Sequence, residues 1–168
     1  MLGISEKEKG SDWILIHDNF RNIKTVVSKL GNKNIQGILF DLGVSSHQLD
    51  TPERGFSFRY TTGPFDLRLD QTKGITGATI INTYSKEDLY DILTRFGEEE
   101  RAWSIVDCIV SARRIKKIET VGDVLDALKR VLPNEKEGML SRIFQAFRIE
   151  ANDELGALKE GLQGSRKY

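Results

Sequence analysis

The sequence predicts an α/β fold that starts with strand, helix and strand and continues as a mainly helical region. Residues 37–43, Gly-Ile-Leu-Phe-Asp-Leu-Gly, form an apolar run bounded by turn residues, which is typical of a strand buried on both faces of a parallel sheet. Residues 13–17 form a second apolar run. Residues 21–31 carry apolar side chains at helical spacing and end at a helix stop, Gly31. This order predicts one βαβ unit.

Asp41 stands where the second predicted strand ends. Ligands of open α/β sheets bind at the carboxyl ends of the strands, where Phe20 is also expected. The small residues Gly43, Ser45 and Ser46 follow, and they would let a ligand approach the backbone closely. A buried carboxylate without a partner is costly, which favours a ligand beside it. We therefore predict Asp41 as a binding or catalytic residue.

Residues 45–74 predict a long ordered loop. Its polar residues and prolines are interspersed with aromatic residues, which argue against disorder, and an ordered loop of this length is usually functional. The boundary between the sheet part and the helical part is expected within residues 45–80.

Four helical segments follow this loop. Ser85 with Asp88 resembles a capping box and starts a helix that ends at Gly97. The apolar spacing then predicts helices at about 98–114, from Thr120 to Pro133, and at 141–163. The apolar residues within 141–163 lie along one face, which predicts a single long amphipathic helix.

The composition is that of an ordinary globular domain. The chain has 168 residues, 39% hydrophobic and 30% charged, and its 25 Lys and Arg residues balance 25 Asp and Glu residues, so any basic surface must be local. Cys108 is the single cysteine, which excludes a disulfide framework and a thiolate metal cluster, and no metal site is expected. Neither a signal peptide nor a membrane span is indicated, so we expect a cytoplasmic location and no membrane partner.

Several ordered motifs carry a resemblance to a known family. They lie at residues 41–50, 53–58, 63–70, 82–84, 90–101, 142–149 and 152–155. Together they closely resemble the bacterial 16S rRNA cytosine-N4 methyltransferases known as RsmH or MraW, over about residues 12–163.

The resemblance implies a fold and a division of the chain. The fold would be a partial class I (Rossmann-like) S-adenosylmethionine methyltransferase with an inserted α-helical domain. Residues 1–50 would be part of the methyltransferase sheet, residues 51–140 the loop and the inserted helical domain, and residues 141–168 a helix that returns to the core.

The resemblance also implies the reaction and the cofactor residues. S-adenosylmethionine would methylate the N4 amine of a cytidine in small-subunit rRNA, in the context of the ribosomal subunit. Phe20 would lie near the cofactor adenine, and Asp41 and Gln48 would contact the cofactor. Asp41 is also a candidate catalytic acceptor for the amine, because an acceptor there would take up positive charge as it develops.

Other parts of the family pattern have no match here. A glycine-rich Gly-Gly-His loop would precede Trp13, and further strands would follow Gln163. We therefore expect a truncated form whose exposed sheet edges favour self-association. Two alternatives stay open: a non-catalytic RNA-binding or assembly module that retains the insert domain, and an unstable remnant without function.

A target base must leave its stack before it is methylated, and stacking and phosphate contacts would offset that cost. The candidate RNA-binding residues are aromatic or basic, and they are Arg54, Phe56, Phe58, Arg59, Arg68, Arg113 and Arg114. The alternative is that the phenylalanines anchor the loop and the loop arginines pair with Asp50, Asp66 and Asp70. The basic residues after position 112 are alternatively a solvated helix end.

Overall fold

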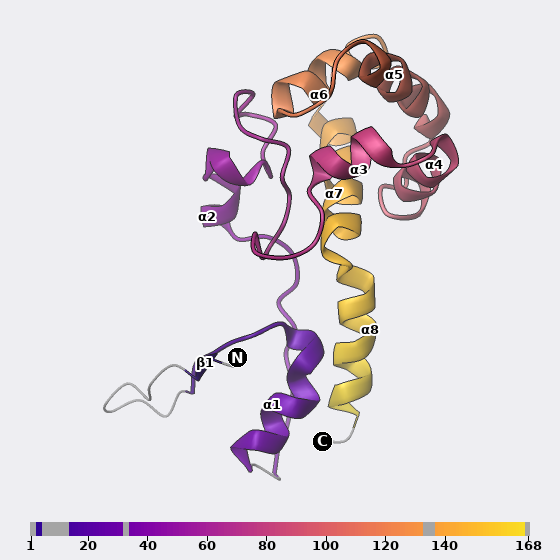
Figure 1. Cartoon of the computed structure of the whole chain (residues 1–168). Coiled ribbons are helices and arrows are strands. Elements are labelled where there is room, and N and C mark those ends of the chain that lie inside the picture. Colours follow the sequence, from indigo (N-terminus) through magenta and orange to yellow (C-terminus); the bar gives the residue numbers. More distant parts are fainter. Residues whose placement is uncertain (1–2, 5–13, 32–33, 133–136, 167–168) are drawn as a thin grey trace. The chain divides into compact units, whose positions relative to one another are not determined.

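The computed structural model describes residues 3–4, 14–31, 34–132 and 137–166 (Figure 1). The chain divides into two compact units. The first unit combines Met1–Asp41 with Glu154–Tyr168, and the second is Leu42–Asp153. Each unit is described separately, and the predicted division at residues 50 and 140 stays a prediction.

The first unit contains two short strands, a 3₁₀ turn and two helices. They are β1 (Gly3–Ile4), β2 (Ile16–His17), η1 (Phe20–Asn22), α1 (Ile23–Leu30) and α8 (Glu154–Ser165). The Asn19 side chain accepts a hydrogen bond from Arg21 N at 3.0 Å and so starts η1. Gly31 ends α1 with a left-handed φ of 65°, as the sequence predicted.

Helix α8 packs against η1 and α1 through glycines. A Cβ atom on Gly161 would lie 3.0 Å from Phe20 Cδ2 and 3.3 Å from Phe40 Cε1. The absence of a side chain at this position therefore brings the α8 backbone close to both rings.

The predicted βαβ unit is not formed by the described residues. Strand β2 pairs with β1, and it does so in antiparallel fashion. Residues 37–43 do not form a strand, and Leu39 within this segment is 93% exposed. A parallel strand exists only through hydrogen bonds to a neighbouring strand, and none is described beside this run. Apolar composition alone was therefore insufficient for the prediction.

The second unit is helical. Its elements are α2 (Ser46–Leu49), η2 (Pro52–Arg54), α3 (Gly77–Thr83), α4 (Lys86–Arg95), α5 (Ala102–Ile115), α6 (Val121–Leu128) and α7 (Glu137–Asn152). The capping box of Ser85 with Asp88 starts α4, and a second capping box, of Thr120 with Asp123, starts α6. The helices predicted at these positions and at 98–114 are confirmed, although α6 ends at Leu128 before reaching Pro133.

The core of the second unit lies where α3 and α4 pack on α7 and where α5 packs on α4 and α6 (Figure 1). Its largest fully buried side chains include Phe65, Phe147, Ile105 and Leu140. Phe65 comes from the long loop and contacts the rings of Phe144 and Phe147 edge to face, so the loop is anchored in this core.

Two predictions about helices need correction. Residues 141–163 were predicted as one helix, but α7 ends at Asn152 and α8 begins at Glu154. Between them, Asp153 adopts a left-handed φ of 48°, which interrupts the helix while leaving the apolar periodicity of the sequence unchanged. The predicted loop at 45–74 is ordered but contains α2 and η2, and α3 was not predicted.

None of the helices in the described residues combines the length and the apolar character needed to span a bilayer.

Candidate functional site

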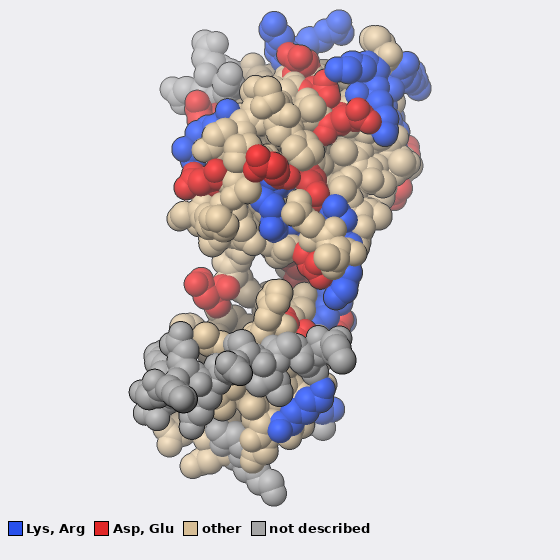
Figure 2. Space-filling model, turned by 60° about the vertical axis from the view of Figure 1, so that its left-hand side comes forward, with Lys and Arg blue, Asp and Glu red and all other residues tan. Residues whose placement is uncertain are grey.

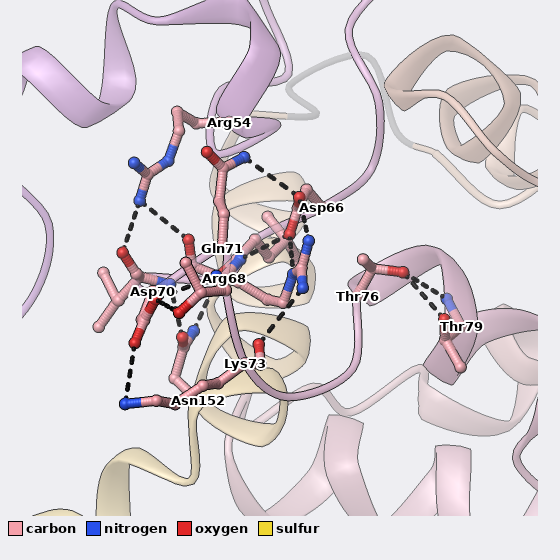
Figure 3. Close-up of polar contacts among 12 residues, drawn as sticks. Arg54, Asp66, Arg68, Asp70, Gln71, Lys73, Thr76, Thr79 and Asn152 are labelled. Carbon is pink, nitrogen blue, oxygen red and sulfur yellow. Dashed lines mark hydrogen bonds and ion pairs between the residues drawn. The ribbon is translucent and has the colours of Figure 1, made fainter.

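The loop at residues 54–71 is held by a polar cluster, defined here as Arg54, Asp66, Arg68, Gln71 and Asn152 (Figure 3). Arg68 donates from Nε to Asp66 Oδ1 at 2.7 Å and from Nη2 to Asp66 Oδ2 at 3.0 Å. Gln71 Nε2 donates to Asp66 Oδ2 at 3.2 Å. Burial alone would raise the pKa of Asp66, but these hydrogen bonds outweigh it and hold that pKa below its ordinary value. Asp66 is therefore an ionised carboxylate at neutral pH.

The same cluster fixes an unusual backbone conformation. Arg54 Nη2 donates to the carbonyl oxygens of Arg68 and Leu69 at 2.9 and 2.8 Å. Asn152 on α7 accepts from Leu69 N at 2.6 Å and donates to Leu67 O at 2.7 Å. Leu67 itself is fully buried with a φ of 66°, a conformation that costs a leucine about 1–3 kcal/mol. The polar cluster keeps this residue in place.

The cluster gives two predicted RNA-binding residues a role inside the protein. The guanidinium groups of Arg54 and Arg68 bond the loop, and the suggested pairing of Arg68 with Asp66 is confirmed. The suggested pairing of arginines with Asp50 and Asp70 is not seen in the described residues: the ion pair of Asp70 is with Lys73. Contact of these arginines with RNA stays a prediction.

A cavity of about 340 Å³ lies between this loop and α7, within the second unit. We call it the loop–α7 cavity. Its lining residues come from residues 44–67 and from one face of α7, and they are Val44, Leu49, Phe56, Ser57, Phe58, Arg59, Leu67, Ser141, Phe144, Gln145 and Arg148. Three predicted RNA-binding residues, Phe56, Phe58 and Arg59, are thus brought together.

Aromatic rings form part of the cavity wall. Phe56 and Phe144 are buried, and Phe58 is partly exposed. The rings of Phe58 and Phe144 meet edge to face with centroids 5.9 Å apart. This aromatic part of the wall is apolar, and the exposed Arg59 adds a positive charge to the lining.

The residues that α7 contributes were missed by the sequence prediction. Ser141, Phe144, Gln145 and Arg148 follow the spacing i, i+3, i+4 and i+7, so they share one face of the helix. The sequence signal was present as two long polar side chains beside an aromatic on one face. It was not recognised because the other residues of the cavity lining are more than 70 positions earlier in the sequence.

The other two predicted RNA-binding residues lie near the end of α5, away from the cavity lining. Arg113 Nη1 donates to Ile81 O at 2.8 Å. Burial, together with the charge of Arg114, lowers the pKa of Arg113. Arg114 is exposed. Figure 2 shows that basic and acidic side chains are intermixed on the face of the second unit that it displays. In the same region Lys116 pairs with Asp123 at 2.6 Å.

The predicted cofactor residues occupy both units. Phe20 is 36% exposed, and its ring meets that of Phe40 edge to face with centroids 5.8 Å apart. Asp41 follows Phe40 and is exposed, which corrects the expectation of a carboxylate buried at a strand end. Gln48 lies in the second unit and completes the capping box of α2, where its Oε1 accepts from Ser45 N at 2.9 Å.

No group of three or more histidine, cysteine, aspartate or glutamate side chains is arranged to hold a metal ion in the residues that the structure describes. The single cysteine, Cys108, is partly buried on α5.

Comparison with known proteins gives one consistent result. Residues 4–168 match the MraW methylase family. Similar proteins include the ribosomal RNA small subunit methyltransferase H of Geobacter sp. strain M21, which is 44% identical over 154 residues, or 89% of this chain and 49% of the relative. The protein of the same name from Ruminiclostridium cellulolyticum is 39% identical over 164 residues, or 95% of this chain and 52% of the relative.

A third relative of that name, from Phocaeicola vulgatus, is 40% identical over 166 residues, or 97% of this chain and 54% of the relative. The chain therefore spans about half the length of the curated relatives it matches. Because the family match covers nearly every residue and includes all the motifs on which the resemblance rested, the chain belongs to the MraW methylase family.

Proposed function

We propose that this chain takes part in the S-adenosylmethionine-dependent methylation of the N4 amine of a cytidine in small-subunit rRNA. The observation that carries the proposal is the match to relatives that are named ribosomal RNA small subunit methyltransferase H, at about 40% identity. An rRNA substrate also places the proposed activity in the cytoplasm, on the small-subunit rRNA or the ribosomal subunit.

The chemistry suggests roles for Asp41, Phe20 and Gln48. The exocyclic amine of cytidine is a poor nucleophile, because its lone pair is delocalised into the ring, and positioning must therefore supply much of the rate. The proposed role of Asp41 is to accept a hydrogen bond from the cofactor or from this amine. S-adenosylmethionine would supply an activated methyl group. The ring of Phe20, held beside Phe40, offers an apolar surface for its adenine, and Gln48 would add an amide contact.

The proposal includes the fold of the family and a mode of association. In the described part of the chain, residues 37–43 make no backbone hydrogen bonds to a neighbouring strand, and Leu39 and Leu42 are 93% and 50% exposed. An extended apolar segment of this kind is suited to pairing with another strand, as in a class I (Rossmann-like) sheet with an inserted α-helical domain. The same segment would support self-association, which sedimentation of the wild-type chain and of Leu39→Lys would detect as a change in mass.

Isothermal titration of S-adenosylmethionine into the chain tests the cofactor part of the proposal. We expect saturable heat for the wild type and at least tenfold weaker binding for Asp41→Asn. Asp50→Asn is a matched control, because Asp50 is also exposed and is not proposed to contact the cofactor. Absence of heat at millimolar cofactor would exclude cofactor binding by this chain.

A second candidate function is that of an RNA-binding or assembly module without catalysis. The loop–α7 cavity favours it, because the cavity belongs entirely to the second unit and includes neither Phe20 nor Asp41. RNA binding by a chain that gives no heat with S-adenosylmethionine would support this candidate over the first.

A further inference from the structure

We propose that the loop–α7 cavity holds one unpaired base of a single-stranded RNA, with Arg59 beside its phosphate. The inference rests on the proposed RNA substrate, and it adds the place on this chain where a base is held.

The size and the wall of the cavity suit a flat aromatic ligand. A volume of about 340 Å³ lies at the lower end of the range for small-molecule sites, roughly 300–1,000 Å³. Phe144 is 5% exposed and is held in place by its edge-to-face contacts with Phe58 and Phe65. Of Phe58, Phe65 and Phe144, only Phe58 is partly exposed, so its ring is the one available to stack on a base.

The polar residues of α7 suit the edge of a base. Gln145 Nε2 donates to Phe96 O at 3.2 Å, and a carbonyl partner fixes the amide with its nitrogen toward Phe96. The Gln145 oxygen is then the atom that remains to accept a hydrogen bond, such as one from an exocyclic amine. Ser141, one turn earlier on the same face of α7, adds a hydroxyl that both donates and accepts.

The charge of the lining distinguishes this cavity from others in the described residues. Arg59 and Arg148 line it, and its lining contains no aspartate or glutamate. Three other cavities in the described residues are each lined by at least two carboxylates. An anionic ligand is therefore favoured here and disfavoured in the other three cavities. An aromatic wall with a cationic rim is the combination that binds single-stranded nucleic acid.

The first experiment measures binding of a fluorescein-labelled single-stranded RNA dodecamer by anisotropy, at constant salt, with the full chain. We expect Phe58→Ala and Arg59→Gln each to weaken binding about tenfold. Trp103→Ala and Arg101→Gln are matched controls, because Trp103 is 49% exposed, Arg101 is exposed, and neither lines the cavity; both should bind as the wild type does. Circular dichroism checks that each variant is folded.

The second experiment separates base recognition from phosphate recognition. A dodecamer with abasic positions should bind the wild type about tenfold more weakly, and Phe58→Ala should then cause no further loss, whereas Arg59→Gln should still weaken binding. Competition with cytidine 5′-monophosphate and with S-adenosylmethionine identifies the occupant. Displacement of the RNA by the nucleotide supports the proposal, and displacement by S-adenosylmethionine alone would overturn it.

The third experiment uses the wild-type chain only, so it does not depend on the stability of a variant. Photo-crosslinking of an RNA that contains 5-iodocytidine, followed by mass spectrometry, should place the adduct within residues 56–59 or 141–148. Adducts confined to Trp103 or to the end of α5 would overturn the proposal, as would equal RNA affinity of Phe58→Ala and the wild type. Failure of methylation with an intact Phe58-dependent RNA affinity would instead refute the proposed enzymatic function alone.

Discussion

Glu99 is a carboxylate in the core of the second unit. It is 3% exposed, and its Oε2 accepts hydrogen bonds from Arg142 Nε at 3.0 Å and Nη2 at 2.7 Å. Its Oε1 accepts from Arg101 N at 3.2 Å, next to the start of α5. One side chain therefore connects the segment before α5 to α7 by charge-assisted hydrogen bonds.

Replacement of Glu99 by alanine should lower the free energy of unfolding by about 2 kcal/mol, because charge-assisted hydrogen bonds to both α7 and the backbone are lost. The loss is smaller than for a fully buried pair, since the Arg142 side chain is 46% exposed and can be solvated. Urea denaturation measures it. Glu100→Ala is the control, since Glu100 is exposed, and it should change stability by less than about 0.5 kcal/mol. Equal stability of the two variants would contradict this account of Glu99.

Acid sensitivity is also set by individual residues. The Lys116 ammonium, with the backbone N–H groups of Thr120 and Glu119, holds the pKa of Asp123 well below its ordinary value of 3.8. The folded state therefore binds fewer protons than the unfolded state, and the stabilisation is present above about pH 4 and is lost as the pH falls through and below that value. Asp123→Asn should lose less stability on acidification than the wild type.

Urea denaturation of both proteins between pH 7 and pH 2.5 checks this difference. Lys116→Gln should also reduce the loss of stability on acidification. The hydrogen bond from the Lys116 side chain is the largest cause of the lowered pKa of Asp123, and this variant lacks it. A steeper loss of stability in Asp123→Asn than in the wild type would have the wrong sign for this explanation.

Single residues also limit what sequence alone could predict about the site. Phe56, Phe58 and Arg59 were among the residues predicted to bind RNA because they are aromatic or basic side chains of one loop, and the structure gathers these three around one cavity. The burial of Asp41 was predicted from the apolar residues before it, and this was wrong because burial depends on what packs against a segment. The contact of Arg54 with Leu69 O depends in the same way on the fold of the whole loop.

Among the elements, the contact between the end of α4 and α7 depends on Gly97. A Cβ atom there would lie 2.8 Å from Leu93 O, 3.0 Å from Arg142 O and 3.2 Å from Ala146 Cβ. Two of these atoms belong to the backbone, so the helices must separate to admit a side chain. Gly97→Ala should therefore destabilise the protein by about 1–3 kcal/mol.

Gly138→Ala is the matched substitution for this prediction. Its Cβ atom would meet nothing closer than Arg142 Nη1 at 3.7 Å, and alanine favours the helix, so α7 should gain about 0.5 kcal/mol. Thermal unfolding of the two variants should thus shift in opposite directions. A shift of the same sign in both would show that packing at Gly97 does not decide the effect.

Elements differed in how well the sequence predicted them. Helices α4 and α6 were predicted at their first residue because a capping box is a local signal, with donor and acceptor three residues apart. The strand at 37–43 was not confirmed, since a strand requires partners elsewhere in the chain. The break at Asp153 was missed because a left-handed φ at an aspartate leaves no periodic trace.

For the molecule as a whole, the hydrophobic core is unevenly distributed between the two units. All the residues of the main core cluster belong to Leu42–Asp153. In the described part of the first unit, the buried hydrophobic side chains are Val27 and Ala157. Burial of apolar surface is the dominant favourable contribution to folding, so the second unit contains most of what is needed for independent stability.

A fragment that consists of Leu42–Asp153 should therefore fold by itself. We expect a helical circular dichroism spectrum, a well-dispersed amide NMR spectrum and a cooperative urea transition whose midpoint matches the main transition of the full chain. The loop–α7 cavity lies inside this fragment, so the fragment should also retain the Phe58-dependent affinity for single-stranded RNA.

The same fragment with Leu140→Ala is the control: deletion of a fully buried side chain should cost about 2–5 kcal/mol and move the midpoint of the urea transition sharply lower. A fragment with collapsed amide dispersion and no cooperative transition would mean that residues of the first unit are required to complete this core.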